Sequence, residues 1–386
     1  MLALILVSVL LPGMLLPDAV PVSKAAKKTA TSAMEKTETH YGIYSPRTDS
    51  EGVTTWDCVY FGNYWQSDTN GDGKADKNDK KEPIKWRVLS VNGDDAFLLA
   101  DQNLDCQKYW DWPEEYLNAK EPPLTGDFTW KWCTVRSWLN GYGADYNMFK
   151  KDYSSDNFLD NAFSAGEQAV IQNANVVSDD NPEYMTEGGD DTTDKIYLLS
   201  IQEVQNSVYG FDRDRGDTNL ASRWAKNTAY AESQGAYTYK PYFDDEKGFW
   251  VVPPTEYNGN GNWLLRTPGY WVNLVTYVGA GGRINKHGKT SGENSTDYFY
   301  NDSIVGDGHD AVRPALNPVT SSVSSGTPAG SVRIPGKVTG LKLKAKKKAV
   351  QASRKKQTGA DGYQLWYSMS KKWKKKKVKP RRKQNL

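Results

Sequence analysis

Three segments in the first third of the chain restrict the possible folds most strongly. They are CVYFGNYWQ (58–66), PIKWRVLSV (83–91) and AFLLADQNL (96–104). Each alternates apolar and polar residues and is rich in aromatic and β-branched side chains, which is typical of half-buried β-strands. The turn sequence NGDD joins the last two segments. We therefore expect these three strands to form an antiparallel meander.

The rest of the chain changes from helical patterns back to short strands. Helices are expected at 134–143, 163–174, 200–210 and 222–233, and strands at 195–200, 263–267, 274–279 and 311–318. Two helices start with capping boxes, Ser164 with Glu167 and Ser200 with Glu203. This order of elements indicates an α+β fold with antiparallel strands, several helices and long irregular loops rich in Gly and Asn.

The ends of the chain differ from its centre in composition. The apolar run LALILVSVLLPGMLL predicts a signal peptide over residues 1–25, with a lipid or membrane anchor as the alternative. A flexible leader is expected at 26–40, a globular domain at 41–318 and a Ser/Gly/Thr linker at 319–333. No second apolar segment follows, so we expect a secreted or cell-surface protein without a membrane span after signal cleavage.

Charge divides the chain into an acidic body and a basic tail. Of 49 Lys and Arg and 47 Asp and Glu, residues 336–386 hold 19 bases and one acid, a net charge of +18. The preceding 335 residues keep 30 bases and 46 acids, a net charge of −16. The tail is therefore expected to contact anionic polymers or to remain solvated without a partner, and no specific nucleic acid is expected.

The stretch DTNGDGKADKND (68–79) has the residue pattern of a calcium-binding loop. Oxygen-bearing side chains fall at positions one, three, five, nine and twelve, Gly73 takes position six, and Lys74 offers its carbonyl at position seven. The expected ligands are Asp68, Asn70, Asp72, Lys74, Asp76 and Asp79. Strand-like segments flank the loop, so we expect a calcium-stabilised hairpin loop rather than an EF-hand or a dockerin. The alternative is a solvated acidic turn.

The cysteines predict little. Cys58, Cys106 and Cys133 form an odd set without a CxxC motif or zinc-ligand spacing. At most one disulfide is expected, so disulfides do not hold this fold together.

Eight segments, taken in order, resemble a known family. They are VYFGNYWQ, EPIKWRVL, FLLADQNLD, VRSWLNG, FSAGEQAVI, DKIYLLSIQEV, NWLLRTPG and AVRPALNP. Together they resemble the domain of unknown function 6273, which occurs in secreted and surface proteins of Firmicutes, over residues 41–318. WLLRTPG and VRPAL also resemble the ends of C-type-lectin-like and formylglycine-generating-enzyme-like domains. The resemblance implies a C-type-lectin-like fold and no established activity.

The basic tail resembles the first half of a bacterial fibronectin type III module. The matching residues are Pro335, VTGLKLK and GADGYQLWYSMSKKWKK, although Arg354 stands where such modules have a Trp. Only three strand-like stretches are present, which is too few to close a seven-stranded sandwich. We therefore expect residues 334–386 to be a truncated, partial β-sandwich.

The late loop region from Asn258 to Asp310 is the expected ligand-binding surface. Its candidate residues are Tyr270, Trp271, Tyr298, Tyr300 and His309, and Asp302, Asp307 and Asp310 are a candidate second cation site. Large aromatic faces can bind sugars or peptides. By contrast, Trp263, Arg266 and Arg313 are expected to be structural, with each Arg paired to acids or backbone carbonyls inside the fold.

Three classes of function are consistent with these features. The first is a non-catalytic binding or adhesion module for a glycan or protein ligand, and the second is a structural spacer of a larger surface protein. The third is an extracellular carbohydrate-active enzyme, since paired carboxylates are possible among 47 acids. The chain has no HExxH, GxSxG or P-loop motif, and its three His are widely spaced, so the binding module is the leading hypothesis.

Overall fold

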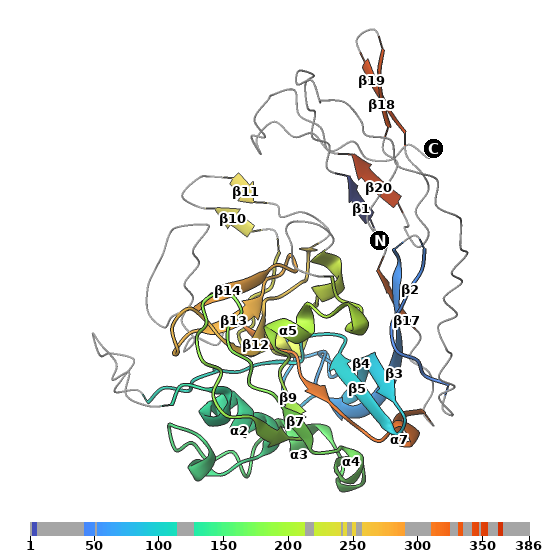
Figure 1. The fold of residues 1–386 in the computed structure, drawn as a ribbon. Coiled ribbons are helices and arrows are strands. Elements are labelled where there is room, and N and C mark those ends of the chain that lie inside the picture. The colour runs from blue at the N-terminus through green and yellow to red at the C-terminus, as the bar shows by residue number, and fades with distance from the viewer. Residues whose placement is uncertain are drawn as a thin grey trace, which may run out of the picture. The chain divides into compact units, whose positions relative to one another are not determined.

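The computed structural model describes residues 2–5, 42–50, 52–113, 127–212, 220–240, 242–244, 249–251, 257–289, 310–324, 331–334, 342–346, 349–353 and 362–365. These residues belong to two compact units. One is Tyr41–Lys337, and the other combines Met1–His40 with Val338–Leu386. The larger unit is an α+β fold built on sheets of seven and five strands, with short helices between them (Figure 1).

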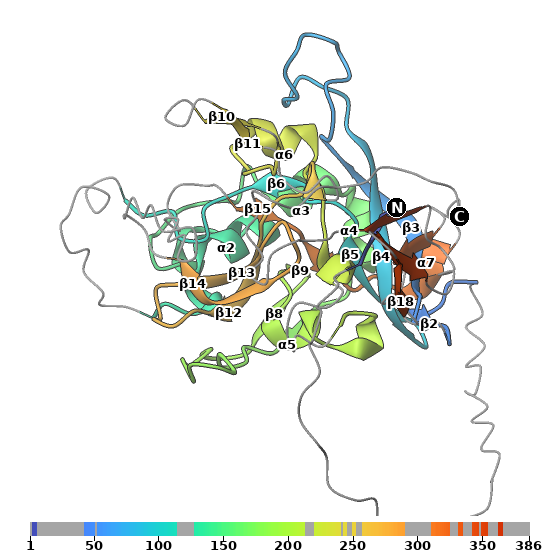
Figure 2. The same ribbon diagram turned by 90° about the horizontal axis from the view of Figure 1, so that it is seen from above.

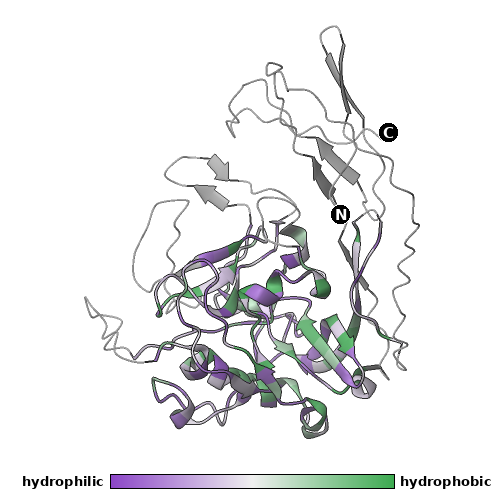
Figure 3. Cartoon of the chain, viewed as in Figure 1, coloured by the Kyte–Doolittle hydropathy of each residue, from purple (hydrophilic) through white to green (hydrophobic). Residues whose placement is uncertain are grey.

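The predicted meander forms the centre of the seven-stranded sheet. It consists of β3 (Thr54–Tyr64), β4 (Glu82–Asn92) and β5 (Asp95–Ala100). The strands are antiparallel, with Val59 opposite Trp86 and Val88 opposite Leu98. Hydrophobic residues dominate β5 (Figure 3), and the apolar side chains of β5 are buried. The meander predicted from alternation is therefore confirmed.

Segments from the middle and the end of the unit complete this sheet. Its order is β17-β3-β4-β5-β16-β9, and β2 (Arg47–Thr48) also pairs with β3. The added strands are β17 (Ser331–Ile334), β16 (Ala315–Leu316) and β9 (Ile196–Tyr197). Within the segment 319–333, which we expected to be a linker, α7 (Thr320–Ser324) buries Thr320 and Val323. The compact unit thus continues beyond residue 318.

The five-stranded sheet carries the late strands. Its order is β14 (Ile284–Lys289), β13 (Val275–Val278), β12 (Trp263–Pro268), β15 (Ala311–Val312) and β6 (Asp105–Cys106). The pair β12–β15 is parallel, and the other pairs are antiparallel. In Figure 2, this sheet and the seven-stranded sheet are seen from above.

One predicted strand is divided between the two sheets, and another is shorter than predicted. The segment 311–318 becomes β15 in one sheet and β16 in the other, and 96–104 ends as β5 before the chain reaches β6. Pro314 has no N–H to continue a ladder. The buried Arg313 side chain lies at the crossing, where its Nε donates to the carbonyl of Ala100 at 2.8 Å. The single long strand expected over 311–318 was therefore wrong, whereas the strand expected over 96–104 is present but shorter.

The predicted helices exist but are shorter. They are α2 (Thr134–Asn140), α4 (Ala165–Val170), α5 (Ile201–Val204) and α6 (Ala229–Ser233), with an additional α3 (Phe158–Ala162). Both expected capping boxes are present, at Ser164 and Ser200. Gly141 ends α2 in the left-handed conformation, with φ of 70°.

The helix expected over 222–233 differs most from the structure, and tertiary backbone hydrogen bonds explain why. The N–H of Asn227 donates to the carbonyl of Gly259 at 3.1 Å, and that of Thr228 donates to Asn103 at 3.0 Å. These groups are therefore used outside any helix. Only α6 and the preceding 3-10 helix η4 (Leu220–Arg223) form in this stretch.

Short elements complete the larger unit. They are η1 (Trp130–Trp132), η2 (Ala144–Tyr146), η3 (Ser207–Tyr209), β7 (Ala174–Val176), β8 (Thr192–Asp194), β10 (Tyr242–Asp244) and β11 (Phe249–Val251). All three cysteines are buried, reduced thiols. None of the helices in the described ranges has the length and apolar character needed to cross a membrane.

The smaller unit is described only at four strands. β1 (Leu2–Ile5) pairs in parallel with β20 (Gly362–Leu365), and β18 (Lys342–Lys346) pairs with β19 (Ala349–Ser353) as an antiparallel hairpin. The rest of the predicted signal peptide, the leader 26–40 and most of the predicted fibronectin-like tail lie outside the described residues.

Candidate functional site

An exposed group of aromatic and apolar side chains extends from the connection between β12 and β13. Trp271 is 59% exposed, and Tyr270 and Val272 beside it are also exposed. The rings of Tyr270 and Trp271 lie 4.7 Å apart at 79°, and Tyr184 packs edge-on against Tyr270 with centroids at 5.0 Å. Together with Met185, which is 71% exposed, these residues form what we term the aromatic surface: Tyr184, Met185, Tyr270, Trp271 and Val272.

Hydrogen bonds between two loops hold this surface in place. The buried side chain of Asn181 donates from Nδ2 to the carbonyls of Pro268 and Lys286, both at 2.8 Å. Thr186 Oγ1 donates to the carbonyl of Tyr270 at 2.9 Å. Within the hairpin, the N–H of Leu274 donates to Trp271 at 3.0 Å. The aromatic rings are thus presented by backbone that is already ordered.

The backbone at Met185 adopts an uncommon conformation. Its φ is +58°, in the left-handed region that non-glycine residues rarely use. The Met185 N–H donates to the carbonyl of Asn181 at 2.8 Å, which closes the turn. Such residues cost on the order of 1 kcal/mol and cluster at functional sites. Here the turn leaves the Met185 side chain exposed beside Tyr184.

The structure brings together only part of the predicted ligand set. Tyr270 and Trp271 are adjacent and exposed, whereas Tyr298, Tyr300 and His309 lie outside the described residues. Asp302 and Asp307 of the candidate second cation site also lie outside them. Asp310 is buried, and its carbonyl accepts a hydrogen bond from Cys106 Sγ at 3.4 Å.

Sequence reasoning missed Tyr184 and Met185. They lie in the segment 178–191, which we term the acidic loop because it carries six carboxylates and no Lys or Arg. The carboxylates belong to Asp179, Asp180, Glu183, Glu187, Asp190 and Asp191. The Asn-Pro turn signal at 181–182 could have placed a loop here, but not its contact with Tyr270, a residue far away in the sequence.

Electrostatic repulsion is concentrated in the acidic loop. Burial raises the pKa of the Asp179 carboxyl, and the nearby Glu203, Asp191 and Asp180 raise it further, against the opposite effect of Arg266. Lys286 lies 3.7 Å from Glu183, and Lys131 lies 2.8 Å from Asp190. Among the described residues, no ion pair reaches Asp180, Glu187 or Asp191.

The predicted calcium loop joins β3 to β4, at the top of the view in Figure 2. The side chain of Asp79 turns inward, where Oδ1 accepts from the N–H of Thr69 at 2.7 Å and Oδ2 accepts from that of Asp76 at 2.8 Å. These bonds, led by the one from Asp76, lower the pKa of the Asp79 carboxyl. Asp68 likewise accepts from the N–H groups of Gly71 and Gly73.

The remaining side chains of this loop form tight turns with its own backbone. Asn70, Asp72 and Asp76 each accept from the N–H two residues further along, at 2.7–3.0 Å. Across the described ranges, no group of three or more His, Cys, Asp or Glu side chains is arranged to hold a metal ion. The structure therefore shows an ordered acidic loop, and a bound cation stays a prediction.

Comparison with known proteins assigns the central part of the chain to a family. Residues 93–317 match the family described as Domain of unknown function (DUF6273). The chain belongs to the DUF6273 family. The match begins at Gly93, after β4, so the predicted calcium loop lies outside it, whereas β12, β13 and the acidic loop lie within it. No curated protein and no solved structure matches the chain.

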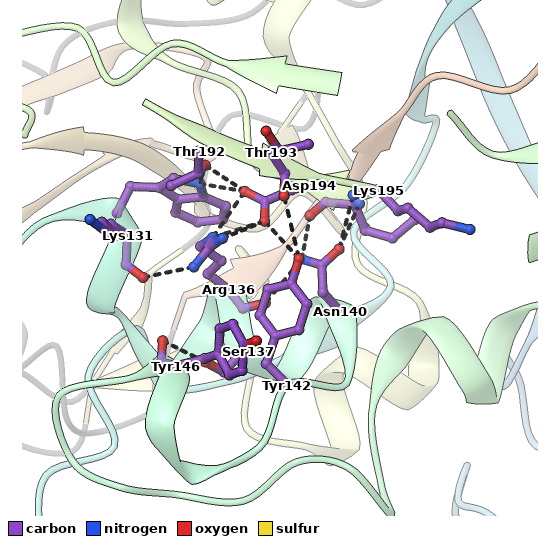
Figure 4. Close-up of polar contacts among 12 residues, drawn as sticks. Lys131, Arg136, Ser137, Asn140, Tyr142, Tyr146, Thr192, Thr193, Asp194 and Lys195 are labelled. Atoms are coloured by element: carbon purple, nitrogen blue, oxygen red, sulfur yellow. Dashed lines mark hydrogen bonds and ion pairs between the residues drawn. The ribbon is translucent and has the colours of Figure 1, made fainter. Parts of the chain in front are cut away.

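Within the DUF6273 domain, a buried ion pair connects the strand that follows the acidic loop to α2 (Figure 4). Asp194 ends β8, directly after the loop, and accepts from Arg136 of α2, whose Nε lies 2.9 Å and Nη2 2.8 Å from Oδ1. Trp130 Nε1 and Thr192 Oγ1 donate to Oδ2 of the same carboxylate, and the Tyr142 hydroxyl donates to Oδ1. The Asp194 carboxylate is fully buried and its partners come from other elements of the fold, so we assign this network to positioning of the loop.

The residues expected to be structural in the DUF6273 domain are confirmed in that role. Arg266 Nη1 donates to Glu203 Oε2 at 2.5 Å and to the carbonyl of Leu198 at 2.7 Å. Arg313 lies over the ring of Trp263 at 4.9 Å. All three residues are buried, and the two arginines pair with an acid or with backbone carbonyls as expected. The stacking of Arg313 on the Trp263 ring was not predicted.

One carboxyl of the domain has the raised pKa that acid catalysis would need. Burial raises the pKa of Asp105 to about 6, against hydrogen bonds from Tyr64, Gln107 and the Cys106 N–H that lower it. Asp105 is only 1% exposed, and its Oδ2 accepts from the Tyr64 hydroxyl at 2.5 Å. A substrate has no access to such a group, so its raised pKa affects stability rather than catalysis.

The stability of the fold should fall as pH rises from about 4 to about 6. In this window the folded protein keeps a proton on Asp105 that the unfolded chain, with an ordinary pKa near 3.9, has released. The contribution of protonated Asp105 to the free energy of unfolding is fully present below about pH 4. Its loss as pH rises through about 6 lowers that free energy by about 3 kcal/mol. Urea unfolding of wild type and Asp105→Asn from pH 4 to 7 measures it. A free-energy difference between the two proteins that does not change with pH would contradict this assignment.

Proposed function

We propose that the protein is a secreted or surface-displayed, non-catalytic binding or adhesion module. The observation that carries the proposal is the exposed pair Tyr270 and Trp271, held by two hydrogen-bonded loops and extended by Tyr184. The ligand is a glycan or a protein. Recognition uses the exposed ring faces of the aromatic surface.

Physical chemistry favours recognition by these side chains. Trp and Tyr supply large rigid contact areas and lose little conformational entropy on binding. Their negative ring faces attract the C–H groups on one side of a sugar ring and the apolar or cationic side chains of a peptide. The loops are cross-linked before binding, which lowers the ordering cost of association.

The proposal also includes three further expectations from the sequence. They are secretion directed by residues 1–25, a C-type-lectin-like fold and a fibronectin type III-like tail. The direct pairing of β12 with β15, Trp263 opposite Ala311, supports the fold expectation, because two late strands bracket a long loop region. The spacer alternative requires no exposed aromatic pair, so loss of binding in a Trp271 variant separates a spacer from a binding module. A carbohydrate-active enzyme would in addition cleave a glycan that it binds, which a binding module would not do.

A glycan and mucin array probed with the full-length protein tests the proposal. Wild type should bind selectively, and Trp271→Ala should weaken binding at least tenfold, as expected for a central aromatic contact. Tyr60→Ala, which removes an aromatic of the other sheet that is also exposed, is the matched control. An array and a set of surface proteins that show no ligand for wild type would favour a spacer role instead.

We also propose that calcium stabilises the loop 68–79 outside the cell. All donors are oxygens, the ligands that calcium prefers. The ligands would be the side chains of Asp68, Asn70, Asp72, Asp76 and Asp79 and the carbonyl of Lys74. No hydrogen bond from a described residue reaches Oδ2 of Asp72 or Asp76, so these carboxylates keep lone pairs for a cation.

Calcium at 10 mM should raise the free energy of unfolding relative to a chelator. For a weak extracellular-type site with a Kd near 1 mM, the increase is about 1.4 kcal/mol. Chemical unfolding with calcium and with chelator measures it. Asp72→Ala should abolish the difference, while Asp94→Ala in the neighbouring hairpin turn should keep it. Identical unfolding curves for wild type in both conditions would rule the site out.

A further inference from the structure

The aromatic surface has a strongly acidic neighbour. Tyr184 and Met185 belong to the acidic loop itself, and Glu183 and Glu187 flank them closely in sequence. Five of its six carboxylates are exposed, and only Asp179 is partly buried. Lys286 lies near Glu183 and Lys131 near Asp190, and the buried Arg266 acts on Asp179. The surface therefore combines ring faces with an excess of negative charge.

This combination selects the charge of a ligand. The faces of Trp and Tyr attract cations, most strongly for Trp. Carboxylates beside them attract the same cations and repel anionic ligands. A neutral sugar would use only the rings, whereas an ammonium group would use the rings and the carboxylates together.

We propose that the aromatic surface and the acidic loop together form a docking site for a lysine-rich polypeptide segment. This inference rests on the proposed function, because it names the ligand chemistry of the same surface. A lysine side chain packs its four-carbon stem on apolar groups such as Met185 and Val272 while its ammonium group reaches a carboxylate. The charge complementarity extends to the whole body of the chain, whose 46 acids exceed its 30 bases before residue 336.

Fluorescein-labelled octalysine provides a direct test with the full-length protein. Fluorescence anisotropy at 150 mM salt compares wild type, Trp271→Ala and the double variant Glu183→Gln/Glu187→Gln. Each variant should weaken binding about fivefold or more, in line with one desolvated cation–π contact or a lost charge pair. The matched control Asp94→Asn/Asp145→Asn removes the same charge from exposed sites elsewhere and should bind like wild type. Octalysine acetylated on every Nζ should not bind.

Each outcome decides the proposal. Equal affinity for octalysine in all four proteins would show general charge attraction and would overturn the docking site. No octalysine binding, with an array ligand that Trp271→Ala abolishes, would overturn this inference and leave the proposed function intact. No binding to either probe would remove both. Self-association of the full chain that octalysine reverses would support the inference and identify a basic segment of a second copy, such as KKWKKKKVKPRRK (371–383), as an occupant.

Discussion

Replacing Asp194 with alanine is expected to destabilise the larger unit by about 3–5 kcal/mol. The change leaves the guanidinium of Arg136 buried without its carboxylate, and removal of one partner of a buried pair has a cost of this size. It also removes the acceptor of Trp130 Nε1 and of the hydroxyls of Thr192 and Tyr142. Equilibrium urea unfolding followed by tryptophan fluorescence measures the effect.

Two further variants separate charge from packing. Asp190 lies four residues before Asp194 and forms an exposed ion pair with Lys131. Asp190→Ala breaks that pair and should change the free energy of unfolding by less than about 1 kcal/mol. The double variant Arg136→Met/Asp194→Leu removes both charges and should lose less stability than Asp194→Ala. If Asp194→Ala and Asp190→Ala prove equally stable, the buried pair does not anchor the fold.

Trp263→Ala should have an effect of similar size, about 3–5 kcal/mol. The ring is fully buried in β12, its Nε1 donates to the carbonyl of Arg223 at 3.1 Å, and Arg313 lies over its face. Truncation leaves a large cavity and removes the cation–π partner of a buried arginine. Thermal and chemical unfolding report the loss.

Trp271→Ala is the matched control, since it truncates an exposed tryptophan in the same hairpin. Its free energy of unfolding should stay within about 0.5 kcal/mol of wild type, while its ligand binding falls. The pair of variants therefore distinguishes structural from recognition roles for two residues that share a residue type. Strong destabilisation by Trp271→Ala would mean that the aromatic surface belongs to the core.

Local patterns predicted the elements whose hydrogen bonds are local. The β3–β5 meander follows from alternation and a turn sequence, and the caps at Ser164 and Ser200 follow from short motifs. The crossing at Arg313 and Pro314 could not be predicted, because it depends on which distant strands pair with each half of the segment. The helix expected over 222–233 failed for the same reason, since Asn227 and Thr228 use their N–H groups in tertiary contacts.

In the candidate site, too, only the features that depend on local sequence could be predicted. Tyr270 and Trp271 could be selected because aromatic residues in a Gly- and Asn-rich loop are typical of exposed contacts. Tyr184 and Met185 could not, because their place depends on bonds from Asn181 and Thr186 to a hairpin about 85 residues later. Whether the loop at 68–79 binds calcium also depends on ligand geometry that spacing alone does not determine.

The way the seven-stranded sheet is completed constrains how this protein folds during its synthesis on the ribosome. β5 pairs with β16 and β3 pairs with β17, so each waits for a partner made more than 200 residues later. Until those residues emerge, the edges of the meander remain open for roughly 10–50 s at ordinary synthesis rates. Translation that stops before residue 311 would release a chain with two unpaired strand edges, which is an aggregation hazard and a natural substrate for chaperones.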